Sequence, residues 1–309
     1  MTRRIIIDTD PGVDDALALL MAYAHPETKV EALTITAGNV GIEHTLRNAL
    51  SLVERVGADT PVYAGARDPL VRPAEDAAFV HGNDGFGDVG LPAPKRVAET
   101  EHAAAAMVRL AKQHPGELTF VMLGPLTNLA LALTLDPDLP KRVPRLVIMG
   151  GAVNGRGNVS RATSEFNIHF DPEAAAVVFG AWPEFELVDW EATLAHGIRF
   201  ADLAGWLAAD NPRARFYDAI SRKTREWMRR TRDITHWHAA DGLAMAAVLD
   251  SAAAEHWETC AVKIELDGVL TRGMTVVDWA GYRGWRVQSR ILMRYRIDRF
   301  AEMIRAALS

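Results

Sequence analysis

Short apolar runs alternate with amphipathic stretches along the first half of the chain. Runs rich in β-branched residues, typical of buried strands, occupy residues 5–9, 30–37, 61–64, 117–123 and 145–149. Between them the spacing predicts helices over residues 11–23, 45–56 and 101–112, and an alanine- and leucine-rich helix after 128. Strands that each alternate with a helix or loop predict a parallel sheet wound on both faces.

The second half continues with helices and then changes character. Helical patterns cover residues 171–179, 199–230, 241–249 and 298–308, with a short strand at 186–188. Apolar runs at 262–266, 274–278 and 287–292 predict a late antiparallel set. Because no repeat, linker or low-complexity tract interrupts the chain, we expect one domain over residues 1–309. The predicted class is α/β: a doubly wound, mostly parallel, Rossmann-like sheet with late antiparallel strands and extra helices.

A segment rich in proline and glycine, residues 65–98, separates the third predicted strand from the next helix. A loop of this length inside a compact domain is usually functional or disordered. We therefore expect it to form a lid or a wall of the functional site.

Composition excludes several classes of function. The 309 residues are 49% hydrophobic and 24% charged, with a net charge of −6, so nucleic acid and anionic membranes are not expected partners. The basic residues of 222–232 are better explained as a solvated helix face than as a polyanion site. A single cysteine, Cys260, rules out an internal disulfide framework, and we found neither a signal peptide nor a run long enough to span a membrane. We expect a cytoplasmic protein.

Four aspartates crowd the turn between the first strand and the first helix: Asp8, Asp10, Asp14 and Asp15. Helix capping accounts for one or two of them but not for all four. Carboxylates gathered beyond the carboxyl end of a strand repel one another unless a counter-charge is present, and a hard divalent cation is the simplest one. By itself, the turn is also compatible with a phosphatase of the haloacid dehalogenase type.

Two further clusters lie downstream. Asn158, Glu165 and Asn167 follow the predicted strand that ends before Gly150, and their amide and carboxylate groups suit a ligand rich in hydroxyls, such as a sugar. Asp241 opens an apolar helix just after a His-Trp-His triplet. A lone aspartate there is most often a helix cap, and a lone histidine is more often structural than catalytic.

Taken together and in order, these motifs resemble those of the nucleoside hydrolases of the inosine–uridine-preferring type. The resemblance extends from the first strand to the last helix, and it is carried by Asp10-Pro11-Gly12-Val13-Asp14-Asp15, Gly38-Asn39, His81-Gly82, Leu123-Gly124-Pro125-Leu126-Thr127-Asn128, Met149-Gly150-Gly151, Glu165-Phe166-Asn167 and Asp171-Pro172-Glu173-Ala174-Ala175. The phosphatase alternative would need a later lysine and an acidic pair, which we do not find, and it leaves the Asn and Glu residues unexplained.

The resemblance implies a bound calcium ion (Ca2+) held by the carboxylates of Asp10, Asp15 and Asp241 and by the backbone carbonyl of Leu123. It also implies that Asp10 is the general base that activates a Ca2+-bound water for attack on the anomeric carbon. The remaining contacts to ribose are expected on the 2′ side from Asp14 and Asn39, on the 3′ side from Asn167 and Asp241, and on the 5′ side from Asn158 and Glu165. Asp8 is not a ligand in this pattern, and we expect it to orient backbone amides.

The chain departs from the family pattern just before the last aspartate. Many members have a histidine there, and purine-specific relatives often have a tryptophan, but this chain has Ala240. His238 or His81 could supply the proton to the departing base instead. If the segment before Asp241 is helical, His238 shares a helix face with Asp241. Alternatively, the base is activated by stacking on Trp237 or Trp227 or through solvent, or the leaving group needs little protonation. Base specificity therefore stays open.

The predicted function is hydrolysis of the N-glycosidic bond of ribonucleosides to free base and ribose. The alternatives are a hydrolase of a non-standard N-ribosyl compound and a catalytically silent nucleoside- or ribose-binding relative. The resemblance also implies a homodimer or homotetramer.

Overall fold

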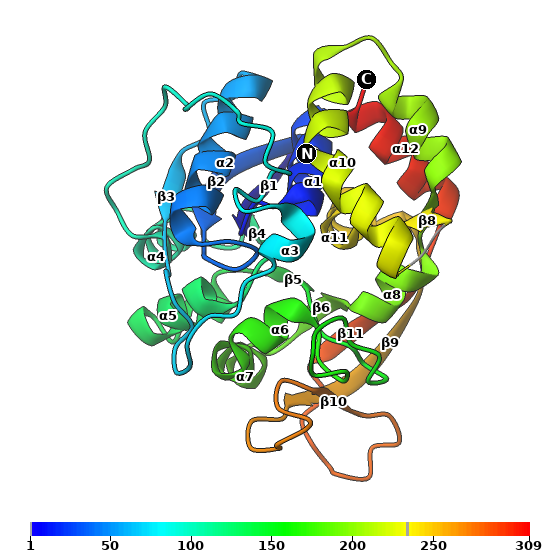
Figure 1. The fold of residues 1–309 in the computed structure, drawn as a ribbon. Coiled ribbons are helices and arrows are strands. Elements are labelled where there is room, and N and C mark those ends of the chain that lie inside the picture. Colours follow the sequence, from blue (N-terminus) through cyan, green and yellow to red (C-terminus); the bar gives the residue numbers. More distant parts are fainter. Residues whose placement is uncertain (1, 233–234) are drawn as a thin grey trace.

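A central sheet runs through the molecule, which we describe from a computed structural model covering residues 2–232 and 235–309 (Figure 1). Its strands are β1 (Arg3–Thr9), β2 (Thr28–Ile35), β3 (Val62–Ala64), β4 (Leu118–Met122), β5 (Arg145–Met149), β6 (Phe185–Val188), β9 (Ala254–Ile264), β10 (Thr275–Asp278) and β11 (Ser289–Tyr295). They lie in the order β10-β9-β11-β6-β5-β4-β1-β2-β3. Two short strands, β7 (Ile198–Arg199) and β8 (His236–Trp237), pair with each other outside this sheet.

The sheet is parallel from β11 through to β3. β9 is antiparallel to β11, and β10 is antiparallel to β9. The predicted class, a mostly parallel α/β sheet with late antiparallel strands, is therefore confirmed. One pairing was not anticipated: β11 also runs parallel to β6, and this contact joins the late strands to the rest of the sheet.

Helices cover both faces of the sheet (Figure 1). They are α1 (Val13–Ala24), α2 (Ile42–Val56), α3 (Ala78–His81), α4 (Ala103–Gln113), α5 (Thr127–Leu135), α6 (Phe166–Phe170), α7 (Pro172–Ala181), α8 (Trp190–Ala195), α9 (Phe200–Leu207), α10 (Pro212–Thr231), α11 (Ala240–Leu249) and α12 (Ile297–Ala307), with 3-10 turns η1 (Leu139–Lys141) and η2 (Ser251–Ala253).

Alternation along β1 shows how the two faces are filled. Ile5 and Ile7 belong to the apolar core that includes α1, α11 and α12, whereas Ile6 belongs to the core that includes α4, α5 and α7. A strand buried on both faces needs a continuous apolar run, which is the pattern seen at residues 5–7. This packing fixes the end of β1, and with it the position of the aspartates that follow.

Three details differ from the sequence predictions. The stretch 199–230 is not one helix but two, α9 and α10, because Asn211 caps a new helix whose first residue is Pro212. Segment 65–98 contains the short helix α3. His236 and Trp237 form strand β8 and α11 begins only at Ala240, so His238 does not share a helix face with Asp241. Within residues 2–232 and 235–309, no helix is long and apolar enough to cross a membrane.

Candidate active site

The candidate site lies where the carboxyl ends of β5, β4, β1 and β2 meet, as expected for a parallel sheet. A cavity of about 780 Å³ opens there, a size suited to a small ligand. Its lining includes most of the residues that the sequence singled out: Asp14, Asn39, His81, Leu123, Asn158, Glu165, Asn167, Trp237, His238 and Asp241. Asp10 and Asp15 are buried and are not part of this lining.

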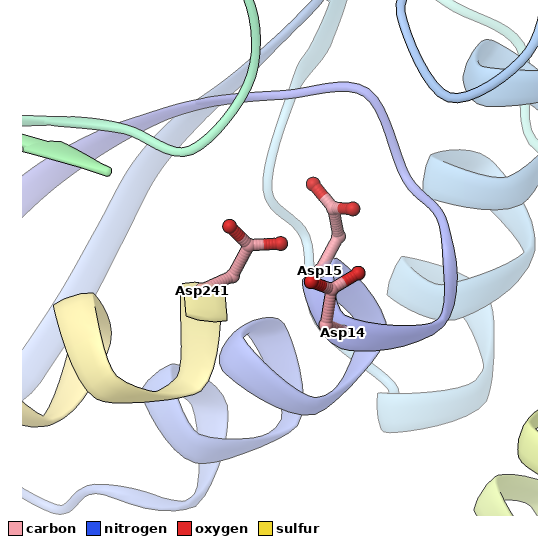
Figure 2. A group of neighbouring side chains, drawn as sticks. All are labelled: Asp14, Asp15 and Asp241. Atoms are coloured by element: carbon pink, nitrogen blue, oxygen red, sulfur yellow. The ribbon is translucent and has the colours of Figure 1, made fainter. Parts of the chain in front are cut away.

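Three carboxylates meet beside this cavity, and two of them, Asp14 and Asp241, belong to its lining. Asp14 and Asp15 begin α1 and Asp241 begins α11, and one oxygen from each lies within 4.8 Å of the others (Figure 2). Asp15 is held by the Thr9 hydroxyl, by the Gly12 amide at 3.0 Å and by Asn39 Nδ2 at 3.0 Å. Asp14 keeps the most contact with the cavity, since 23% of its side chain is exposed.

Burial dominates the electrostatics of this acidic cluster. It raises the pKa of Asp14 and of Asp15 to about 6. Burial, reinforced by the neighbouring carboxylates, raises the pKa of Asp241 well above its usual range. In the part of the chain that the structure describes, no lysine or arginine is among the main influences on these pKa values.

The acidic cluster fits a divalent cation. Asp14 Oδ1 is buried without a hydrogen-bond partner, and the donor set is made of oxygens only. Hard cations such as Ca2+ and Mg2+ prefer oxygen ligands, and their charge would offset the repulsion between the carboxylates. The sequence had assigned Asp14 to sugar binding, so its place within the cluster is a result of the fold.

Asp10 lies next to this cluster and is held from several sides. The Asn39 amide donates to its Oδ2 at 2.6 Å, and Asn39 Nδ2 donates to its backbone carbonyl at 3.1 Å. Its carboxylate is enclosed by Gly38 and Gly124, where an added Cβ would clash with the carboxylate oxygens. Burial, followed by the charge of Asp15, raises the pKa of Asp10 well above its usual range. The two glycines of the sequence motifs thus make room for one side chain.

The amide and carboxylate residues after β5 also line the cavity. Glu165 caps α6 and accepts the Gly151 and Asn167 amides at 3.0 Å, and burial raises its pKa to about 7. Asn167 Nδ2 donates to the Leu123 carbonyl at 2.6 Å. Asn158 Oδ1 is buried without a partner. These groups place several donors and acceptors along one side of the cavity.

Two histidines and a tryptophan line the other side. His81 Nδ1 accepts the Val13 amide at 3.2 Å, so the neutral ring carries its proton on Nε2; burial lowers its pKa to about 4. His238 Nδ1 lies 3.4 Å from the Thr193 carbonyl, and its ring lies 6.3 Å from that of Trp190. Trp237 is almost fully buried. Both candidate proton donors therefore reach the cavity, whereas Ala240 contributes no polar group to it.

Asp8 differs from the expectation that it orients backbone amides. Its Oδ2 accepts hydrogen bonds from the Thr34 hydroxyl at 2.7 Å and from Asn128 Nδ2 at 2.9 Å, both of them side-chain donors. Burial raises its pKa to about 7. Asp8 therefore links β1 to β2 and to α5 through side-chain hydrogen bonds.

The segment predicted as a lid or wall does line the cavity, through Glu75, Asp76, Ala77, Phe79, Val80 and His81. Phe166, Trp190 and Arg232 line it as well. Much of the arginine-rich face is paired within the chain, since Arg222 and Arg225 contact Asp218 and Lys223 contacts Asp88. Phe166 lies within the Glu165-Phe166-Asn167 motif, but no local pattern marked Trp190, because it lies at a helix start where apolar residues are common.

Comparison with known proteins agrees with this geometry. Residues 5–302 match the family model described as inosine-uridine preferring nucleoside hydrolase. The chain belongs to this family. It is 35% identical to uridine nucleosidase 1 of Arabidopsis thaliana over 302 residues, covering 96% of this chain and 89% of the relative. It is also 35% identical to the non-specific ribonucleoside hydrolase RihC of Salmonella enteritidis over 300 residues, covering 97% and 95%.

Solved structures support the same conclusion. An inosine-guanosine nucleoside hydrolase superposes with a TM-score of 0.93 at 30% identity, covering 100% of this chain and 99% of that one. The predicted resemblance is thereby confirmed: the protein is a nucleoside hydrolase, an N-glycosidase that cleaves ribonucleosides. The acidic cluster is consistent with a metal site in such an enzyme.

Proposed function

We propose that this nucleoside hydrolase is Ca2+-dependent and releases free base and ribose, with Asp10 as general base. The observation that carries the proposal is the group of carboxylates beside a ligand-sized cavity, with no neutralising lysine or arginine among the main influences on their pKa values in the described chain. Asp10, Asp15, Asp241 and the Leu123 carbonyl would hold the ion. When bound, the ion supplies Lewis acidity that lowers the pKa of a coordinated water.

Asp10 is suited to accept a proton. The Asn39 amide orients its carboxylate, and burial next to Asp15 raises its proton affinity. Hydrolysis of a glycosidic bond develops positive charge on the sugar ring, so the same carboxylates also stabilise the transition state. One buried residue would thus combine proton transfer with charge stabilisation.

The walls of the cavity suit a ribose. Asp14 and Asn39 would contact the 2′-hydroxyl, Asn167 and Asp241 the 3′-hydroxyl, and Asn158 and Glu165 the 5′-hydroxyl. The open side of Asp14 and the unpartnered Asn158 Oδ1 support this assignment, because a buried acceptor without a donor is costly until a ligand hydroxyl satisfies it.

The departing base faces aromatic residues rather than a side chain at position 240. His81, whose Nε2 carries a proton in the neutral ring, and His238 are the candidate donors to the base, with Trp237 as an apolar wall. The absence of a polar group at Ala240 favours, as a second candidate substrate class, N-ribosyl compounds whose leaving group needs little protonation.

The relatives named uridine nucleosidase and non-specific ribonucleoside hydrolase support a substrate range that includes uridine. We further propose a homodimer or homotetramer, testable by light scattering, and a cytoplasmic location, which the single buried cysteine favours.

A reducing-sugar assay over a panel of purine and pyrimidine ribonucleosides, with and without chelator, tests the proposal. We expect ribose release that disappears with chelator and returns when Ca2+ is added. Tight nucleoside binding without ribose release from any substrate would contradict it and indicate a silent binding relative.

A further inference from the structure

We propose that Arg232 is a positioning residue that fixes Asn158 and thereby sets a preference for ribonucleosides with a free 5′-hydroxyl. The inference rests on the proposed function, in which Asn158 contacts that hydroxyl. It concerns a residue at the rim of the cavity that neither the sequence motifs nor the mechanism use.

The evidence begins with a chain of contacts around the rim, formed by Phe79, Trp227, Arg232 and Asn158, which we call the rim chain. All of these residues line the cavity. The Phe79 and Trp227 rings meet edge to face with centroids 5.8 Å apart, and the Arg232 guanidinium lies 5.7 Å from the Trp227 centroid. Arg232 Nη2 donates to the Asn158 carbonyl at 2.7 Å. The rim chain therefore links α3, the end of α10 and the loop that carries Asn158, and Figure 1 shows α3 beside α10.

Asn158 is the member of the rim chain whose side-chain oxygen is available to accept a hydrogen bond from a ligand. Its backbone amide donates to the Ser164 carbonyl at 3.1 Å, and its carbonyl accepts from Arg232. Its side-chain Oδ1 is buried and has no partner. With both backbone groups engaged, the side-chain oxygen remains available to a hydroxyl donor from the substrate.

The rest of the loop is fixed at its base rather than at Asn158. The Glu191 carboxylate accepts the Asn154 and Arg156 amides, each at 2.8 Å, and the Gly157 amide donates to the Ala162 carbonyl at 2.7 Å. Arg232 adds a connection from α10, on the far side of the cavity mouth. Its planar guanidinium can lie over Trp227 while one nitrogen donates to a carbonyl, a combination that a lysine ammonium does not reproduce.

The test compares uridine with 5′-deoxyuridine in the Ca2+-loaded enzyme and an Arg232→Met variant. Methionine keeps an apolar side chain against Trp227 but cannot donate to Asn158. We expect kcat/KM for uridine to fall about three- to tenfold, and that for 5′-deoxyuridine to change by less than about twofold, because the lost bond acts only through the 5′-hydroxyl contact. Arg230→Met is the matched control: Arg230 is exposed in the last turn of α10, just before Arg232, and is not among the described residues that line the cavity.

Asn158→Ala calibrates the effect. It should lower kcat/KM for uridine more than kcat/KM for 5′-deoxyuridine. If both residues act as one unit, adding Arg232→Met to Asn158→Ala should lower kcat/KM for uridine little further. Equal losses on both substrates in Arg232→Met, or no loss on either, would overturn the inference, as would an Asn158→Ala variant that does not distinguish the two substrates. Cleavage of uridine by the unmodified enzyme tests the proposed function separately.

Discussion

The backbone amide of Asn39 donates a 2.6 Å hydrogen bond to Asp10 Oδ2, joining the ends of two neighbouring parallel strands. Within residues 2–232 and 235–309 no charged side chain pairs with this carboxylate, and the residue that orients it also supports Asp15 through its own side chain. The floor of the site is therefore a small hydrogen-bonded unit rather than a set of independent aspartates, and its disruption is expected to affect turnover more than stability.

Asp10→Asn tests the general base. The amide keeps the size of the side chain and can still accept the Asn39 hydrogen bond, but it cannot take up a proton. We expect kcat to fall about 10²- to 10⁴-fold, measured by ribose release from uridine. Thermal stability in the presence of ribose should still show that the sugar binds, and near-normal turnover would disprove the assignment.

Gly124→Ala tests the enclosure of Asp10. A Cβ at this position would lie 2.5 Å from Asp10 Oδ1 and 3.2 Å from the Asp10 amide nitrogen, so the Asp10 carboxylate must move. Overpacking of this kind costs about 1–3 kcal/mol, and we expect at least about a tenfold loss of kcat/KM because catalytic geometry tolerates little displacement.

Gly180→Ala provides the matched control for that substitution. Gly180 lies in α7, and apart from its chain neighbours and the backbone of its own helix, no atom of the described residues lies within 4 Å of an added Cβ. Alanine should leave activity unchanged and stabilise the helix by about 0.5–1 kcal/mol. Urea denaturation of both variants, alongside kinetics, separates the local clash from a general effect of alanine.

Removal of the cation should make stability fall with rising pH. Burial raises the pKa of Asp14 and of Asp15 to about 6, above the ordinary value near 4. In the cation-free protein the folded state therefore retains protons that the unfolded chain releases, so this contribution to stability is complete below about pH 4 and is lost as pH rises through about 6.

Thermal melting between pH 5 and pH 8 checks this, with EGTA in one series and Ca2+ in the other. A bound cation stabilises the ionised carboxylates, so the loss of stability with pH should be smaller or reversed in the Ca2+ series. Parallel pH dependences in the two series would count against a cation at the acidic cluster.

His81→Ala and His238→Ala identify the donor to the departing base. The Val13 amide fixes the His81 tautomer with its proton on Nε2, so we expect His81→Ala to slow uridine cleavage by about 10²-fold or more. The leaving group of p-nitrophenyl riboside, a nitrophenolate, departs without protonation. We therefore expect the cleavage rate of this substrate to fall much less. If His238→Ala shows this difference between substrates and His81→Ala does not, the roles are exchanged.

Sequence reasoning identified much of the fold because its signals are local. The alternation of apolar runs and amphipathic stretches predicted the parallel part of the sheet, and apolar runs marked the late strands. It did not predict that β11 also pairs with β6, since pairing between distant strands leaves no periodic trace. Asn211-Pro212 is a helix-start signal that marks the break between α9 and α10. The helical pattern on both sides of it nevertheless favoured a single helical stretch.

In the site, too, some features could be predicted from local sequence and others depended on contacts between distant segments. The sequence by itself determined which residue types stand at the strand ends: the aspartates after β1, Asn39 after β2 and Leu123 after β4. Their convergence could be anticipated because parallel strands end at one edge. Only the tertiary structure decided that Asp14 joins Asp15 and Asp241, that Asp10 is enclosed between two glycines, and that Arg232 reaches Asn158. These outcomes depend on side-chain direction and on packing between distant segments, which periodicity along the chain does not encode.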